Sequence, residues 1–258
     1  MLQIFALSGG YLELPRESMI CDASPSRWTV PIECFLVAHP RGRLLFDTGL
    51  NCETMTNMLG RYGPERARRF GVHSKPGDDV VSQLALLGLA PADVRYVANS
   101  HWHFDHCGAN ASFPDVPILV QQREMDAARS PEVLARGRYR PSLPDYDHPL
   151  RYQAIDGEHD VFGDGSVVLI PTYGHTPGHQ SLLVRPDHGP RIVLTADACY
   201  TRENMDRDVL PTVVWDEAEM AHALRRLRDL RDKQGATTLY GHDPEQWSAL
   251  TRAPTSLV

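Results

Sequence analysis

A cluster of four metal-ligating side chains constrains this chain more than any other feature of its sequence. Residues 99–110 read N-S-H-W-H-F-D-H-C-G-A-N and directly follow a short apolar run. Three imidazoles and one carboxylate within six residues are the donors that Zn²⁺ and similar ions prefer. In a loop that leaves a strand, His101 and His103 can point to one side and Asp105 and His106 to the other. The loop therefore predicts ligands for two neighbouring ions.

Three later segments offer further ligands of the same kind. Gly174–His179 reads G-H-T-P-G-H, Thr195–Tyr200 reads T-A-D-A-C-Y and Tyr240–Asp243 reads Y-G-H-D. Each segment follows an apolar run and places a His or Asp where a strand is expected to end, which is where sheet proteins gather site residues.

The rest of the chain predicts sheets covered by helices in one domain over residues 1–258. Short apolar runs that end in polar clusters are typical of buried strands. These runs are Ile4–Leu7, Cys34–Ala38, Leu44–Phe46, Val94–Ala98, Ile118–Val120, Val167–Ile170, Leu182–Val184, Ile192–Thr195 and Thr237–Tyr240. Helical segments alternate with some of them, which indicates an α/β arrangement.

Two helices are clear from the spacing of apolar residues. One is predicted over Glu217–Asp232, with Asp216 as its N-cap and Glu219 as the capping-box partner. The other is predicted over Asp78–Leu87 and ends at Gly88.

Two long stretches do not fit the strand and helix pattern. Asn51–Pro76 is rich in Gly, Arg and Met, and Arg129–Gly165 is polar with several Pro and Tyr. Irregular connections of this length are predicted either to bind substrate or to be solvated excursions. The arginines of the first stretch suit an acidic substrate or a solvated helix face.

Charge and cysteine usage exclude several classes of protein. Acidic residues outnumber basic ones by 33 to 26, giving a net charge of −7, so a nucleic-acid partner is not expected. The five cysteines form no C-x-x-C pair, which favours a reducing compartment over a disulfide framework. Neither a signal peptide nor a long apolar segment is present in the sequence, so we expect a cytoplasmic protein without a membrane partner.

The set H-x-H-x-D-H, G-H-T, a lone Asp after a strand and a final His resembles the metallo-β-lactamase superfamily. The resemblance covers essentially the whole chain, because the turn Phe46–Gly49, F-D-T-G, also matches. It implies a four-layer αβ/βα sandwich with a dinuclear metal site at one edge of the sheets. It also implies that Asp47 orients a metal ligand rather than binding metal, and that His179 has a supporting role.

The ligand sets follow from the same resemblance. His101, His103 and His175 would bind one ion, Asp105, His106 and His242 would bind the other, and Asp197 would bridge the two. The implied cofactors are two divalent transition-metal ions per chain, with Zn²⁺ as the expected metal. Cys199, two residues after Asp197, is interpreted as a packing residue.

Within the superfamily the sequence is most similar to the N-acyl-homoserine lactonases, metallohydrolases that act on a cyclic ester. The matching segments are Ser100–Asn110, Gly174–Ser181, Asp197–Asn204 and Gly241–Asp243. This likeness implies a small-molecule lactone as substrate and attack by a hydroxide that bridges the metals. The likeness also implies that Tyr200 stabilises the developing oxyanion and that Asp105 passes a proton to the leaving oxygen. Phe104 is expected to line the substrate pocket. A homodimer is possible.

Features that the sequence lacks disfavour four other activities of this superfamily and leave two alternatives. A glyoxalase II needs a glutathione-binding region, and only 16 residues follow His242. The B1 and B2 β-lactamases have a cysteine at the position of Asp197, a nuclease of this superfamily needs a basic arm, and a flavodiiron protein needs a flavin domain. Two alternatives survive: hydrolysis of another lactone, such as 4-pyridoxolactone or an aryl lactone, and a non-catalytic metal-binding scaffold. A bridged, open site is a poor choice for the scaffold.

Overall fold

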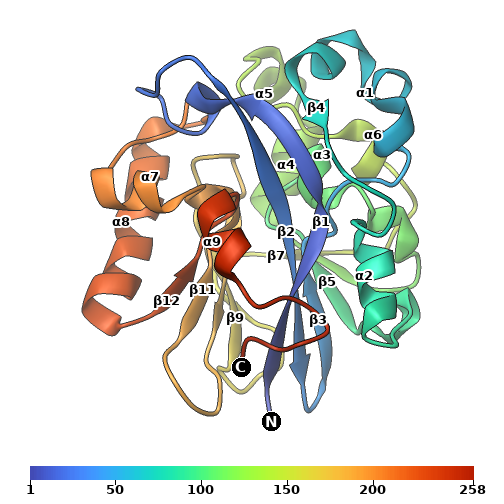
Figure 1. Ribbon diagram of the computed structural model, residues 1–258, viewed down its shortest axis with the longest axis vertical. Helices are drawn as coiled ribbons and strands as arrows, with labels where there is room; N and C mark the ends of the chain where they lie inside the picture. The colour runs from blue at the N-terminus through green and yellow to red at the C-terminus, as the bar shows by residue number, and fades with distance from the viewer.

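All nine apolar runs contribute strands to two β-sheets that face each other in the computed structural model, which describes residues 1–258 (Figure 1). The first sheet is mixed and has the order β4-β1-β2-β3-β5-β6-β7. Its strands are β1 (Gln3–Pro15), β2 (Arg27–His39), β3 (Gly42–Phe46), β4 (Gly71–Val72), β5 (Tyr96–Ala98), β6 (Ile118–Gln121) and β7 (Tyr152–Ile155). β3, β5, β6 and β7 run parallel, so their carboxyl ends meet at one edge.

The second sheet has the order β12-β11-β10-β9-β8. Its strands are β8 (His159–Asp160), β9 (Val167–Pro171), β10 (Gln180–Val184), β11 (Ile192–Leu194) and β12 (Thr237–Leu239). β11 and β12 are parallel and the other pairs are antiparallel. As a result, β9, β11 and β12 all end at the same side of this sheet.

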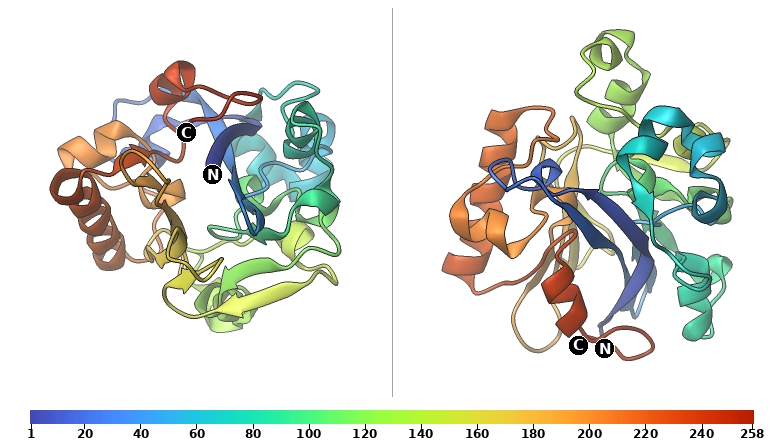
Figure 2. Two further views of the ribbon diagram at one scale, coloured as in Figure 1. Left: turned by 90° about the horizontal axis from the view of Figure 1, so that it is seen from below. Right: turned by 45° about the horizontal axis from the view of Figure 1, so that its top comes forward.

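Helices cover the outer faces of both sheets, so the expected four-layer αβ/βα sandwich is confirmed (Figure 2). The helices are α1 (Thr54–Arg69), α2 (Val80–Leu86), α3 (Phe104–Cys107), α4 (Gln122–Arg129), α5 (Pro131–Ala135), α6 (Leu143–Tyr146), α7 (Arg202–Arg207), α8 (Glu217–Gln234) and α9 (Pro244–Ala249). Residues of α2 and α4 pack on the first sheet, and Leu224, Leu227 and Leu230 of α8 pack on the second. None of these helices has both the length and the apolar character needed to cross a bilayer.

Apolar side chains on both faces of the strands explain why the sheets stack on each other and on the helices. A core cluster of 21 buried residues lies between them and takes Phe35, Val37 and Phe46 from the first sheet and Leu169 and Leu182 from the second. The opposite faces of the same strands, with Leu36 and Leu45 for example, face the helices. Both sheets are therefore buried on both faces, which is why their strands read as continuous apolar runs.

The expectation that Asn51–Pro76 and Arg129–Gly165 lack regular structure is wrong. The first stretch forms α1 and β4, and the second forms α5, α6, β7 and β8. α1 is kinked, with non-helical backbone angles at Asn57 and at Gly63, which precedes Pro64. Because Gly and Pro normally interrupt helices, the sequence of this stretch does not predict the helix.

The capping box predicted for α8 is only half present. The Asp216 carboxylate accepts a hydrogen bond from the Glu219 backbone N–H at 2.9 Å, as an N-cap does. The Glu219 side chain instead accepts two hydrogen bonds from Arg123 of α4, both at 2.8 Å. The Glu219 side chain thus pairs with Arg123 rather than accepting a hydrogen bond from the Asp216 backbone N–H, which a complete capping box requires.

Glu33 of β2 makes stability depend on pH. Both of its carboxylate oxygens are buried without a hydrogen-bond partner, and burial, with Asp243 nearby, raises its pKa well above the usual value. The folded state therefore binds this proton more tightly than the unfolded state does. The free energy of unfolding should fall as pH rises above the unfolded pKa near 4.3, by about 1.4 kcal/mol per pH unit, until the pH reaches the folded pKa.

We expect Glu33→Gln to remove most of this slope between pH 5 and 8. Denaturant titrations of the metal-loaded protein at several pH values measure it. Glu245→Gln, which changes an exposed glutamate of α9, is the control and should keep the parent slope. An identical slope in parent and Glu33→Gln would show that Glu33 does not carry the pH dependence.

Candidate metal centre

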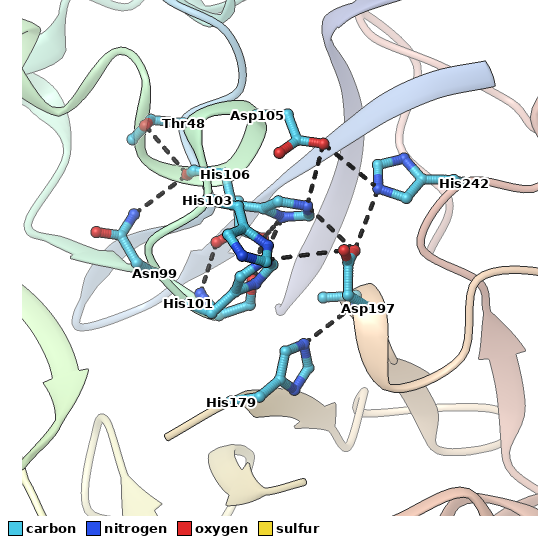
Figure 3. Close-up of polar contacts among 12 residues, drawn as sticks. Thr48, Asn99, His101, His103, Asp105, His106, His179, Asp197 and His242 are labelled. Atoms are coloured by element: carbon cyan, nitrogen blue, oxygen red, sulfur yellow. Dashed lines mark hydrogen bonds and ion pairs between the residues drawn. The ribbon is translucent and has the colours of Figure 1, made fainter. Parts of the chain in front are cut away.

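The predicted ligands converge at one edge of the sandwich because each follows the carboxyl end of a strand (Figure 3). The loop from His101 to His106 follows β5 of the first sheet. His175 follows β9, Asp197 follows β11 and His242 follows β12, all in the second sheet. Their donor atoms form two groups, each within 4.8 Å: His101, His103, His175 and Asp197, and Asp105, His106 and His242.

In the first group, ring nitrogens point at one another. Nδ1 of His103 lies 3.0 Å from Nε2 of His101 and 3.0 Å from Nε2 of His175. Burial lowers the pKa of all three imidazoles, so they are neutral, the form that ligates metal. Asp197 Oδ2 completes the group at 3.2 Å from Nε2 of His175.

In the second group, His106 and His242 face the carboxylates of Asp105 and Asp197. Nε2 of each imidazole lies 3.1 Å from Asp197 Oδ1, and their distances to Asp105 Oδ2 are 3.7 and 3.8 Å. Asp197 thus presents one oxygen to each group. Although burial opposes its charge, the imidazoles of His106 and His242 hold the Asp197 pKa well below its usual value, and Asp197 in turn raises the pKa of both imidazoles.

Hydrogen bonds on the outer nitrogens turn the inner nitrogens toward the centre of the site. The Nδ1–H groups of His106, His175 and His242 donate to Asp47 at 2.8 Å, to the Val213 carbonyl at 3.0 Å and to the Pro31 carbonyl at 2.7 Å. A neutral imidazole that donates from Nδ1 has a lone pair at Nε2. This arrangement is the usual support for metal-ligating histidines.

Ser100 holds the proton of His101 on Nδ1, as in the three histidines above. The Ser100 hydroxyl donates to Asp47 at 2.7 Å, so its oxygen accepts from Nδ1–H of His101 at 2.9 Å. Asp47 also accepts the Ser100 backbone N–H at 2.6 Å. Asp47 therefore orients two histidines and does not lie in either donor group.

A divalent ion fits both groups. Buried His106 Nε2 and Asp197 Oδ1 have no hydrogen-bond partner. Buried polar atoms without a partner are rare in proteins and require an explanation. Nitrogen and carboxylate donors are a set that Zn²⁺ and related ions accept.

His179 and Cys199 lie beside the centre without joining it. His179 Nε2 accepts the backbone N–H of Asp197 at 3.1 Å, while Nδ1 contacts the Thr172 hydroxyl at 2.9 Å, so it fixes the Asp197 loop. The Cys199 thiol donates to the Thr201 carbonyl at 3.4 Å within an apolar cluster. Burial raises its pKa, and a protonated thiol is not a metal ligand.

A cavity of about 900 Å³ opens over the two groups. His103, Asp105 and Tyr200 lie in its wall, and so does Phe104, whose ring contacts the rings of Tyr62 and Phe70 at centroid distances of 5.1 and 5.2 Å. Trp102, by contrast, is fully buried in the core behind the loop.

The Tyr200 phenol lies 3.2 Å from Nδ1 of His175. Because that nitrogen already donates to the Val213 carbonyl, the hydroxyl hydrogen of Tyr200 is not needed there. Burial and then the charge of Asp197 raise the pKa of Tyr200 well above 10, so the phenol is neutral and can donate a hydrogen bond.

Glu124 of α4 is a supporting residue that the sequence motifs do not include. Its fully buried carboxylate accepts four hydrogen bonds: from Trp102 N–H at 3.0 Å, the Tyr139 hydroxyl at 2.7 Å, the Thr176 hydroxyl at 2.8 Å and Gly178 N–H at 2.8 Å. A Cβ at Gly178 would come within 2.2 Å of the Glu124 backbone nitrogen. The signal available in the sequence was an acidic residue just after β6, at the same edge as the ligands.

Glu124 ties together the two loops that carry His101, His103 and His175. We expect Glu124→Gln to weaken metal binding by about 10- to 100-fold, because an amide can accept on one atom only and turns its NH₂ toward donors. Competition with a chromophoric chelator measures the affinities. Glu132→Gln, at an exposed site on α5, should bind metal as the parent does, and equal affinities in all three proteins would contradict the role given to Glu124.

Known proteins resemble this chain over nearly its full length. Residues 27–242 match the family model described as the metallo-beta-lactamase superfamily. An N-acyl homoserine lactonase AttM from Azorhizobium caulinodans is 34% identical over 98% of this chain and 97% of that protein. An N-acyl homoserine lactonase from a Bacillus species is 34% identical over 95% of this chain and 94% of that protein. A solved N-acyl homoserine lactone hydrolase with the product N-hexanoyl-L-homoserine at its catalytic metal centre superposes with a TM-score of 0.88, at 29% identity over 99% of this chain and 98% of that chain.

Proposed function

The chain belongs to the metallo-β-lactamase superfamily, and from this premise we propose that it is a metal-dependent N-acyl homoserine lactonase. The observation that carries the proposal is the pair of His and Asp donor groups, joined by Asp197, in the wall of an open cavity. The lactonase relatives align over almost the entire chain. A structural metal would be expected in a closed site without such a cavity.

Each donor group would hold one divalent ion, and Zn²⁺ suits the nitrogen and carboxylate donors. His101, His103 and His175 would hold the first, Asp105, His106 and His242 the second, and Asp197 both. When bound, such ions lower the pKa of water toward neutrality and polarise an ester carbonyl.

The protein groups have separate tasks in opening the ring. Tyr200, neutral and in the cavity wall, donates a hydrogen bond to the carbonyl oxygen as negative charge develops on it. Asp105 has the most exposed carboxylate of the ligands, with 14% of its side chain accessible. It takes the proton released by the attacking water and passes it to the ring oxygen as the acyl C–O bond breaks. The product is the ring-opened N-acyl homoserine.

Metal content and turnover test this function together. We expect elemental analysis of the metal-replete protein to give close to two ions per chain, with N-hexanoyl homoserine lactone hydrolysed, activity lost on chelation and restored by Zn²⁺. His175→Ala should lower the metal content, whereas His188→Ala, at an exposed site away from the centre, should not. One ion or none in the parent, or full activity after exhaustive chelation, would reject the dinuclear assignment.

A further inference from the structure

Three arginines in the wall of the catalytic cavity lack an acidic partner. Arg66 and Arg69 come from α1 and Arg138 from the segment between α5 and α6. Arg66 donates to the Arg140 backbone carbonyl at 2.8 Å and lies 3.5 Å from the Ser142 hydroxyl. Arg69 donates to the Ser18 hydroxyl at 3.1 Å. Arg138 makes no hydrogen bond or ion pair.

The acidic residues at the mouth are compensated elsewhere. Glu65 pairs with Arg140, and Asp22 and Asp208 pair with arginines outside the cavity. Glu217 lies in the first turn of α8, where the helix dipole stabilises an acid. Asp105 and Asp197 belong to the metal groups. The positive charge of the three arginines is therefore not neutralised by the protein.

Aromatic rings beside the metal-ligand loop contact two of these guanidinium groups. The Arg66 guanidinium lies 5.5 Å from the centre of the Phe104 ring, next to ligand Asp105, and 5.6 Å from that of Tyr62. Arg69 lies 5.8 Å from the centre of the Phe70 ring. Cation–π contacts of this kind fix an arginine while leaving its N–H groups free for a ligand.

An ordinary solvated helix face would not produce this placement. Arg68 belongs to the same helix and is exposed, but it does not line the cavity. Arg66, which is half-buried, and Arg69, which is exposed, line the cavity from the part of α1 that follows the kink at Gly63 and Pro64. Leu12, Leu14 and Val30 supply apolar wall in the same cavity.

We propose that the preferred substrates are N-acyl homoserine lactones whose acyl chain ends in a carboxylate, with Arg66, Arg69 and Arg138 as its receptor. This inference rests on the proposed function: with the lactone ring at the metal centre, the acyl chain has to lie in the rest of the cavity, which the three arginines line. The apolar wall accommodates methylene groups, and the planar guanidinium fork matches the two oxygens of a carboxylate.

The test compares two lactones of the same chain length, N-hexanoyl homoserine lactone and its analogue with a terminal carboxylate, N-(5-carboxypentanoyl) homoserine lactone. For the parent holoenzyme we expect kcat/KM to favour the carboxylate substrate by about tenfold or more at low salt, and the ratio to shrink as salt screens the charges. In the double variant R69Q/R138Q the ratio should fall toward one. Arg68→Gln, which removes the same charge from the solvent face of α1, should keep the parent ratio.

The outcomes separate the inference from the function on which it rests. A parent that hydrolyses the neutral lactone as well as the acidic one overturns the carboxylate receptor and leaves the lactonase assignment standing. An equal loss on both substrates in R69Q/R138Q also overturns the receptor, because it assigns the arginines a structural role. Turnover of neither lactone by the metal-loaded parent rejects the proposed function and the inference with it.

Discussion

Replacement of Asp197 by asparagine is expected to remove bound metal and to lower kcat/KM by more than about 100-fold, the upper end of what loss of a supporting residue around a metal costs. Asp197 is the only ligand whose two oxygens face both donor groups, at 3.1 Å from His106 and His242 and 3.2 Å from His175. An amide keeps the size of the side chain but removes its negative charge and one acceptor. Both ions should therefore bind more weakly in the same variant.

The matched control is Cys199→Ala, two residues along the same loop. Its thiol packs in an apolar cluster and donates to a backbone carbonyl, so this variant should lose some stability while retaining its metal. Elemental analysis after dialysis and steady-state kinetics on N-hexanoyl homoserine lactone measure both. A Cys199→Ala protein without metal, beside a metal-loaded Asp197→Asn protein, would indicate a thiolate site and refute the ligand set.

Tyr200→Phe is expected to lower kcat by about 10- to 1,000-fold with KM nearly unchanged. A hydrogen bond that strengthens only as the oxyanion forms stabilises the transition state more than the bound substrate, so kcat and kcat/KM fall together. Comparable donors are worth about 2.7–4 kcal/mol, and sharing of the charge with a neighbouring ion explains the lower end of the range. Phenylalanine keeps the ring, which stacks 5.5 Å from that of His242.

Kinetics at fixed metal loading test this role. Tyr62→Phe is a useful control because Tyr62 also has a buried hydroxyl near the cavity, but that hydroxyl donates to Asp145 at 2.9 Å and not toward the metal groups. It should affect kcat less than Tyr200→Phe does. An unchanged kcat in Tyr200→Phe would show that the phenol is structural.

The sequence predicts the strands and the positions of the candidate ligands at their ends for the same physical reason, whereas the division of the ligands into two sets follows from the resemblance to the family. A strand buried on both faces must be apolar throughout, and a group of His and Asp side chains directly after it needs a partner. Val167–Ile170 followed by His175 shows this pattern, and the structure places both where the pattern puts them.

Where a strand lacks the contrast between an apolar run and the polar residues after it, the sequence predicts the strand too short or not at all. The apolar run Ile4–Leu7 ends before Ser8, yet β1 continues to Pro15 through an irregularity in its pairing with β2. β7 lies at the edge of its sheet, with Gln153 and Ala154 exposed. Its short sequence has no alternation that marks a strand.

The supporting residues of the site depend on tertiary structure. Nothing local distinguishes Glu124 from an acid in the first turn of any surface helix, because its four donors come from three distant segments. Arg66 and Arg69 line the cavity while Arg68 of the same helix does not, a difference that residue type alone does not show. Ligands can be read from residue type, whereas orientation and support have to be seen in three dimensions.

The division of the ligands between the two sheets has a consequence for how the protein assembles. One sheet supplies His101, His103, Asp105 and His106, and the other supplies His175, Asp197 and His242. Neither half holds a complete donor group, so tight metal capture has to wait until the halves have docked. The free energy of metal capture is then added to that docking, since a ligand that binds only the assembled state stabilises that state. Partly folded chains emerging during synthesis would compete poorly for scarce metal, and the ions would go to chains that have completed the sandwich.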